Sequence, residues 1–127
     1  MAIVGIGTDI IEIGRLDAHL QKSDKLARRI LTDAEFERFN SHSQPVRFLA
    51  KRFAAKEAAV KAIGIGIGNG MSWQHVEVRN YESGQPYLVF SGEFARQCEL
   101  RNITSSHISI SDEQHYAVAT VVLEGTF

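Results

Sequence analysis

Charged residues interrupt a segment of the chain that is rich in apolar and small residues. The run from Phe48 to Ile63 contains six alanines, and among its charged residues are four that need explanation: Arg52, Lys56, Glu57 and Lys61. At about 100° per residue, this run predicts a helix that is apolar or small nearly all round. Such a helix is normally buried, and a buried charge is tolerated only when it is paired, bound to metal or directed into a ligand cavity. The four charges therefore need partners.

The charge balance of this segment indicates an anionic ligand. Between Arg47 and Lys61, five basic residues accompany a single acid, Glu57, so the local net charge is +4. One alternative is an i,i+4 ion pair between Glu57 and Lys61, with the other cations reaching the surface. One glutamate cannot neutralise all the cations, however, and lysine and arginine are common ligands of phosphate. A molecule with several phosphates is the better counterion.

Asp9 is a second charge in apolar surroundings. Residues 2–13 form a β-branched run broken by two glycines, which predicts a buried strand. Asp9 has the same parity as Ile3 and Ile11, so it should point toward the interior. If the strand lies beside the helix, Asp9 and Glu57 converge and, with water and phosphate oxygens, form a site suited to magnesium. The alternative is that Asp9 is a turn or capping acid.

Two other patterns could contact a ligand. The glycine run from Gly64 to Gly70 could bring backbone amides close to a phosphate, but it follows a helix and lacks the Gly-Lys-Ser/Thr of a phosphate-binding loop. Residues 105–111 alternate polar and apolar residues along a strand, with His107 and Ser109 on one face. His107 is either a surface histidine or a phosphate contact.

The elements that must position these residues come in mixed order. Thr32 and Glu35 form a capping box that opens a helix, and Pro45 ends the helical block before Phe48. We expect short helices, the long helix and two antiparallel hairpins over the following ranges: helices 15–21, 24–31, 48–63 and 93–100, and strands 76–79, 87–90, 107–111 and 116–123. Without a regular βαβ repeat, this order predicts an α+β fold with a mainly antiparallel sheet wrapped around the long central helix.

Length and composition set wider limits. The 127 residues predict a single domain, 1–127, with 44% hydrophobic and 23% charged residues, an ordinary globular composition. The net charge of −1 provides no case for a nucleic acid or an anionic membrane as partner. The single cysteine, Cys98, and the absence of a signal-like segment at Met1 to Ile6 predict a cytoplasmic protein.

Two short motifs of this chain are distinctive: Gly5-Ile6-Gly7-Thr8-Asp9, and Arg52-Phe53-Ala54-Ala55-Lys56-Glu57-Ala58 with the following Lys61-Ala62 and glycines. Through these motifs, and over essentially the whole chain, the sequence resembles the holo-[acyl-carrier-protein] synthase family of phosphopantetheinyl transferases. The resemblance implies the 4'-phosphopantetheinyl transferase fold and a homotrimer that binds coenzyme A between neighbouring subunits. It further implies transfer of phosphopantetheine from coenzyme A to a serine of an acyl carrier protein, in support of fatty acid biosynthesis.

The resemblance also implies roles for individual residues. Asp9 and Glu57 match the carboxylates that hold magnesium against the coenzyme A diphosphate, and Lys61 matches the lysine beside that diphosphate, where it would stabilise the leaving phosphate. Glu57 or its bound water would take the serine proton. Further coenzyme A contacts would come from Arg52, Lys56, Gly64, Gly66, His107 and Ser109. One departure is that residues 64–68 read Gly-Ile-Gly-Ile-Gly, where relatives often carry a hydroxyl or basic side chain.

Acyl carrier proteins are acidic, so a basic docking helix is expected. Arg15, Arg28 and Arg29 are the candidates, and the alternative is that they are ordinary solvated helix charges. Two other functions stay open: a noncatalytic module of the same fold that binds coenzyme A or a carrier protein, and a different magnesium-dependent phosphoryl or nucleotidyl transferase.

Overall fold

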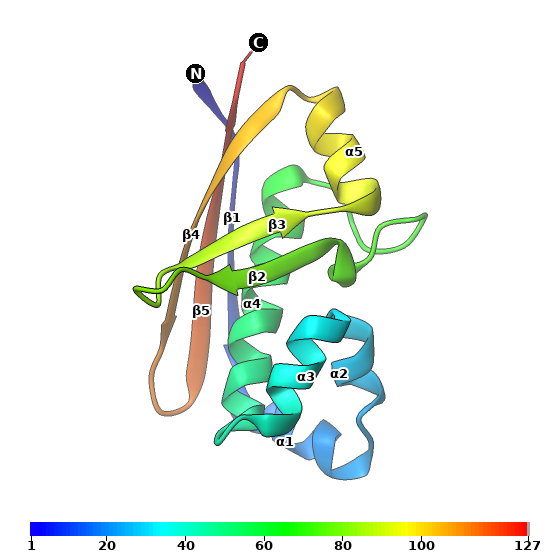
Figure 1. Cartoon of the computed structure of the whole chain (residues 1–127), viewed down its shortest axis with the longest axis vertical. Coiled ribbons are helices and arrows are strands. Elements are labelled where there is room, and N and C mark those ends of the chain that lie inside the picture. Colours follow the sequence, from blue (N-terminus) through cyan, green and yellow to red (C-terminus); the bar gives the residue numbers. More distant parts are fainter. Residues whose placement is uncertain (127) are drawn as a thin grey trace.

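A three-stranded antiparallel sheet and one long helix form the centre of the computed structural model, which describes residues 1–126. The strands are β1 (Ala2–Glu12), β5 (Tyr116–Gly125) and β4 (Ile103–Asp112), in the order β1-β5-β4. Helix α4 (Pro45–Ile63) runs along the inner face of this sheet (Figure 1). The fold is therefore α+β with an antiparallel sheet against a central helix, as predicted.

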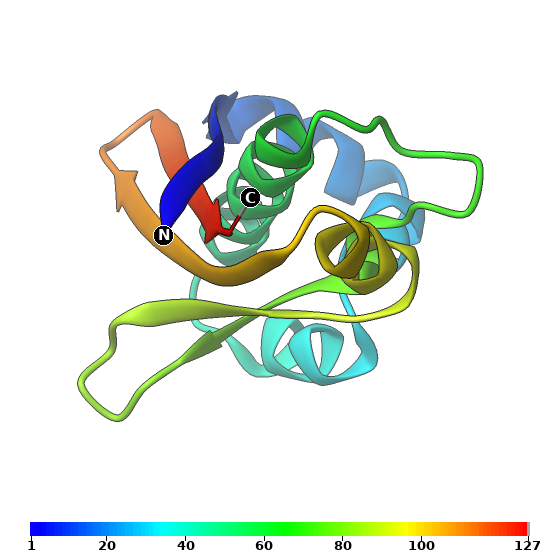
Figure 2. The same cartoon turned by 90° about the horizontal axis from the view of Figure 1, so that it is seen from above.

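The remaining elements cover the other side of α4. The helices α1 (Ile13–Lys22), α2 (Lys25–Ile30) and α3 (Asp33–Ser41) gather at one end of the molecule, and α5 (Gly92–Leu100) lies at the other (Figure 1). A separate hairpin of β2 (Val76–Asn80) and β3 (Pro86–Phe90) crosses between them, preceded by a short 3-10 helix, Trp73–His75. Figure 2 shows α4 between the three-stranded sheet and these elements.

Most predicted elements are present within a few residues of their expected ends. The capping box of Thr32 and Glu35 opens α3, and Gly64 ends α4 in the left-handed conformation with a φ of 78°. Two boundaries differ by three or more residues, because α4 begins at Pro45 and not at Phe48, and β4 begins at Ile103 and not at His107. A proline in the first turn loses no intrahelical hydrogen bond, so Pro45 starts the helix that it was expected to precede.

Strand β1 packs directly on the backbone of α4. A Cβ atom added to Gly5 would lie 1.9 Å from the carbonyl oxygen of Ala62, and one added to Gly7 would lie 2.0 Å from that of Ala58. Neither contact is possible, so any side chain at these glycines would push the strand away from the helix. The two glycines of β1 and the alanines of α4 therefore allow the close approach that places Asp9 beside the helix.

A β-bulge changes the side-chain alternation of β1. The pairing with β5 shifts between Ile3 and Gly5, so Ile3 points outward and is 64% exposed, contrary to its predicted parity with Asp9. After the bulge, Gly5, Gly7, Asp9 and Ile11 face α4, whereas Ile6 and Ile10 point outward. Asp9 therefore faces the interior, as predicted.

The outer face of the three-stranded sheet is uncovered in the described residues 1–126 (Figure 2). Ile6 and Ile10 on this face are 64% and 62% exposed. The inner face packs on α4 through Ala117, Ala119 and Val121, which are fully buried. Over the same residues, the structure has no helix with the length and hydropathy needed to span a bilayer.

Candidate active site

Asp9 and Lys61 form an ion pair where β1 crosses the C-terminal half of α4. The Lys61 Nζ donates to Asp9 Oδ1 at 2.9 Å and to the carbonyl oxygen of Thr8 at 3.1 Å. The Asp9 side chain is 16% exposed and that of Lys61 is 53% exposed. Lys61 therefore pairs with Asp9, and the predicted alternative of a pair between Lys61 and Glu57 does not occur.

Glu57 lies one helical turn before Lys61 and so on the same side of α4. Its Oε1 accepts a hydrogen bond of 2.8 Å from the indole Nε1 of Trp73. Trp73 is a contact that the sequence analysis missed, because the glycine run separates it from the helix and no spacing pattern links it to Glu57. The structure thus gathers Asp9, Glu57 and Lys61 around one turn of α4.

This set of side chains fits a magnesium ion that also binds a substrate. Magnesium sites in phosphate-handling proteins use one or two carboxylates together with water and substrate phosphates. Asp9 and Glu57 supply two carboxylates on neighbouring elements, and in residues 1–126 no cluster of three or more His, Cys, Asp or Glu side chains forms a complete protein cage. Lys61 adds a cation beside them that suits a phosphate.

Lys56 has a different position from the one predicted. It is 0% exposed, and its Nζ donates to Glu35 Oε1 at 2.5 Å and to the carbonyl oxygen of Ile30 at 2.7 Å. Burial lowers the pKa of Lys56, and the negative charge of Glu35 opposes that shift. Because its ammonium group is enclosed and bonded inside the protein, Lys56 is a core residue and not a contact for coenzyme A.

Glu35 is the buried anion that the charge count of the central helix left out. It is 2% exposed, its Oε1 bonds Lys56, and its Oε2 accepts the backbone N–H of Val78 at 2.9 Å. In the sequence, Glu35 is recognisable only as the acid of a capping box, a role that it also has. The excess of positive charge on α4 is therefore smaller than the sequence implied.

Arg52 is a buried residue that also lines a pocket rich in basic side chains. It is 5% exposed, lies 3.6 Å from Glu35, and donates to Asn80 at 3.2 Å, while its Nε has no hydrogen-bond partner among the described residues. Its guanidinium group sits 4.6 Å from the centre of the Phe48 ring. Burial lowers the pKa of Arg52 to about 10, with Glu35 opposing the shift. Arg52 is therefore charged at neutral pH and short of partners.

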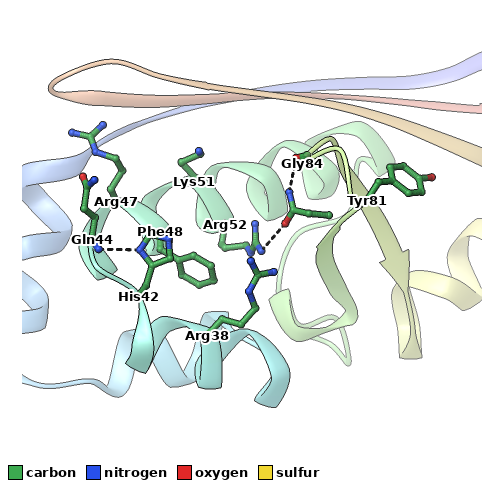
Figure 3. A pocket seen from close by; sticks show the side chains of 10 residues that line it. Arg38, His42, Gln44, Arg47, Phe48, Lys51, Arg52, Tyr81 and Gly84 are labelled. Atoms are coloured by element: carbon green, nitrogen blue, oxygen red, sulfur yellow. Dashed lines mark hydrogen bonds between the residues drawn. The ribbon is translucent and has the colours of Figure 1, made fainter.

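The basic pocket beside Arg52 has a volume of about 530 Å³ (Figure 3). Arg38 and Arg52 extend toward each other from α3 and α4, and Lys51 lines the same space. The other lining residues are His42, Gln44, Arg47, Phe48, Asn80, Tyr81 and Gly84. Four of the ten are lysine or arginine and none is acidic. The pocket therefore suits an anion with an aromatic or planar group.

Asp112 contacts two cations that line this pocket. Its two oxygens bind Arg47 at 2.8 Å and Lys51 at 3.5 Å, and the Arg47 hydrogen bond is the main cause that lowers the pKa of Asp112. One carboxylate thus forms ion pairs with two cations, so the pocket keeps a net positive charge. The sequence could not reveal this pocket, because α3, α4 and the turn between β2 and β3 supply its walls.

The predicted residues His107 and Ser109 lie on the outer face of the sheet. Both are exposed, whereas Ile108 and Ile110, which alternate with them, pack on the core, so the predicted alternation of this strand is correct. His107 Nε2 contacts Glu124 Oε1 on β5. Since Asp9 faces α4, the sheet itself separates His107 and Ser109 from Asp9 within one chain.

The predicted docking arginines are all exposed. Arg15 lies 3.7 Å from Glu12, Arg28 binds Asp24 at 2.9 Å, and the guanidinium group of Arg29 lies over the Trp73 ring. Gly64 and Gly66 are also exposed, directly after α4. These positions are accessible to a partner or ligand, but the structure does not bring them into contact with Asp9.

Comparisons with known proteins show what this chain is similar to. Residues 5–121 match the sequence profile of the 4'-phosphopantetheinyl transferase superfamily. A holo-[acyl-carrier-protein] synthase of Pseudoalteromonas atlantica is 68% identical over 124 residues, which cover 98% of each chain.

Solved structures show the same similarity. The holo-[acyl-carrier-protein] synthase of Neisseria meningitidis is 37% identical with a TM-score of 0.90 and covers 97% of this chain and 99% of its own. That of Bacillus anthracis, in complex with coenzyme A (3',5'-ADP), is 42% identical with a TM-score of 0.81 and covers 98% of each chain. The family resemblance predicted from the two motifs is thus confirmed, and the chain belongs to the 4'-phosphopantetheinyl transferase superfamily.

Proposed function

We propose that this chain is a holo-[acyl-carrier-protein] synthase, which transfers the 4'-phosphopantetheine group of coenzyme A to a serine of apo acyl carrier protein. The observation that carries the proposal is the grouping of Asp9, Glu57 and Lys61 around one turn of α4. The names of the relatives and the coenzyme A complex of the Bacillus anthracis protein support the same substrates.

The reaction is a phosphoryl transfer. The serine hydroxyl attacks the β-phosphorus of coenzyme A, an oxygen–phosphorus bond forms, and the diphosphate bridge breaks to release adenosine 3',5'-bisphosphate. Glu57, directly or through a water, takes the serine proton, and Lys61 stabilises the charge on the leaving phosphate. Asp9 and Glu57 would hold magnesium, which offsets the negative charge of the diphosphate when bound.

Coenzyme A requires more contacts than the Asp9 cluster provides. The basic pocket holds a second set of cations, but Arg52 and Glu57 are five residues apart and so point about 140° away from each other around α4. We assign the pocket to the adenosine phosphates of a coenzyme A molecule shared between two subunits. A neighbouring chain can then supply the basic pocket together with His107 and Ser109. These groups would lie opposite the Asp9 cluster of the first chain.

The shared site implies an oligomer, and we propose the homotrimer of the family. The outer face of the sheet, with Ile6 and Ile10 largely exposed, is the contact surface that neighbouring copies would cover. Arg15, Arg28 and Arg29 would dock the acidic carrier protein. We further place the protein in the cytoplasm and in fatty acid biosynthesis, where its carrier substrate is used.

The direct test is the intact mass of an apo acyl carrier protein after incubation with the chain, coenzyme A and magnesium. A gain of one phosphopantetheine that a chelator abolishes would establish the reaction. Coenzyme A binding with no gain on several carriers would favour the noncatalytic module. Reaction with a nucleoside triphosphate in place of coenzyme A would favour a nucleotidyl transferase.

Mixed oligomers test the shared site. Asp9→Asn removes a carboxylate of the reaction centre, and Lys51→Glu adds an acid to the basic pocket. Each variant alone should be impaired at low coenzyme A, but refolded one-to-one mixtures should recover roughly a quarter of wild-type activity. The reason is that random assembly places an intact Asp9 opposite an intact Lys51 in roughly one site of four. If the activity of the mixture is no greater than the sum of the activities of the two separate variants, each chain forms its site alone.

A further inference from the structure

Within residues 1–126, the Trp73 indole is the only side chain that hydrogen-bonds the Glu57 carboxylate. The indole N–H donates to Glu57 Oε1 at 2.8 Å, which leaves the other carboxylate oxygen for magnesium or for the serine proton. A carboxylate on a long side chain has several rotamers, and one directed hydrogen bond selects among them. Trp73 therefore sits where it can orient Glu57.

The indole ring itself is held on two sides. Its plane meets the Phe53 ring edge-on at a centroid distance of 5.4 Å and an angle of 83°, and the Arg29 guanidinium group lies 5.4 Å from the ring centre. Phe53 is one turn before Glu57 on α4, so the ring packs against the same helix to which its N–H donates, and Arg29 adds a contact from α2. The packing of the ring, and not only the backbone of the 3-10 helix, therefore sets the direction of the indole N–H.

The backbone around Trp73 is also fixed. The side chain of Ser72 accepts the N–H of Gln74, and the Gln74 amide group donates to the carbonyl oxygens of Arg28 at 2.7 Å and of Leu31 at 3.0 Å. These bonds tie the short 3-10 helix to α2 without touching Glu57. They provide a way to loosen the segment while the indole bond is kept.

We propose that Trp73 is a positioning residue of the reaction, whose indole N–H orients the Glu57 carboxylate for magnesium and substrate. A buried or half-buried indole N–H usually finds some acceptor, so a purely structural role is the competing explanation. The choice of a carboxylate as acceptor, at a site with two acids and a lysine, favours positioning. This inference rests on the proposed function and deepens it.

Trp73→Phe keeps an aromatic ring and removes the N–H. We expect magnesium affinity, measured by calorimetry with coenzyme A present, and kcat each to fall about 10- to 100-fold, with KM for coenzyme A nearly unchanged, because a group that orients a metal ligand has effects of this size. The matched control is Gln74→Ala, which should stay within about twofold of wild type in both quantities. Wild-type values for Trp73→Phe, or an equal loss in Gln74→Ala, would overturn the proposal.

The wild-type protein offers a second readout, since Trp73 is its single tryptophan. Magnesium added with coenzyme A should change the indole emission with the same midpoint as the calorimetric binding, and Asp9→Asn should remove that response. An unchanged emission while calorimetry shows binding would overturn the role of Trp73 alone. A wild-type chain that binds coenzyme A and magnesium but never modifies a carrier would instead overturn the proposed function.

Discussion

Asp9→Asn should lower kcat for carrier modification on the order of 1000-fold, because a metal ion that offsets transition-state charge contributes several kcal/mol and each ~1.4 kcal/mol is tenfold in rate. The variant has nearly the same size, so β1 should still pack on α4. Lys61 loses its ion-pair partner, but its side chain is 53% exposed and can be solvated. The fold should therefore survive while activity is lost.

Three measurements separate this effect from unfolding. Circular dichroism and light scattering should match wild type, and calorimetry should show weaker magnesium binding in the presence of coenzyme A. Asp17→Asn, which changes an exposed acid on α1, is the matched control and should keep wild-type activity. Magnesium-dependent turnover near the wild-type rate in Asp9→Asn would remove Asp9 from the metal site.

Glu35→Gln should reduce the free energy of unfolding by about 3–5 kcal/mol, since it leaves buried cations without their anion. The amide can keep the capping hydrogen bond of α3, but it cannot neutralise Lys56 or Arg52, which are 0% and 5% exposed. Urea unfolding measures the loss. Glu37→Gln, at an exposed position of the same helix, should change stability by less than about 0.5 kcal/mol.

The pH dependence of this loss has a definite sign. Burial lowers the pKa of Lys56 in the folded chain below its ordinary value, and removal of Glu35 takes away the charge that opposes the shift. The unfolded Glu35→Gln chain then binds more protons than the folded one at alkaline pH, so its stability rises with pH. The difference in unfolding free energy between Glu35→Gln and wild type should therefore become smaller as the pH rises from neutral toward the ordinary lysine pKa.

Lys56→Met provides the converse test. This variant removes the buried ammonium group and leaves Glu35 paired with Arg52. We expect the free energy of unfolding to change, and the affinity for coenzyme A to stay the same. The double variant with Glu35→Gln should be less destabilised than the sum of the single changes, because the two groups form one pair. A selective loss of coenzyme A binding in Lys56→Met would return Lys56 to the ligand site that the sequence predicted.

The sequence alone determined the local structure and singled out the candidate residues for the reaction. The alternating strands, the capping box of Thr32 and Glu35 and the long alanine-rich helix follow from side-chain periods that operate over a few residues. The same local logic singled out Asp9, Glu57 and Lys61 as charges in apolar segments, and the short motifs around them identified the family.

Only the tertiary structure decided which charges find partners inside the protein. Lys56 and Lys61 are five residues apart on one helix and look alike in the sequence, yet Glu35 of α3 neutralises the first in the core and Asp9 of β1 holds the second at the surface. The link between Trp73 and Glu57 and the basic pocket likewise join segments far apart in the chain. The packing of elements that are distant in the chain brings each charge to its partner. This packing leaves no periodic pattern in the sequence.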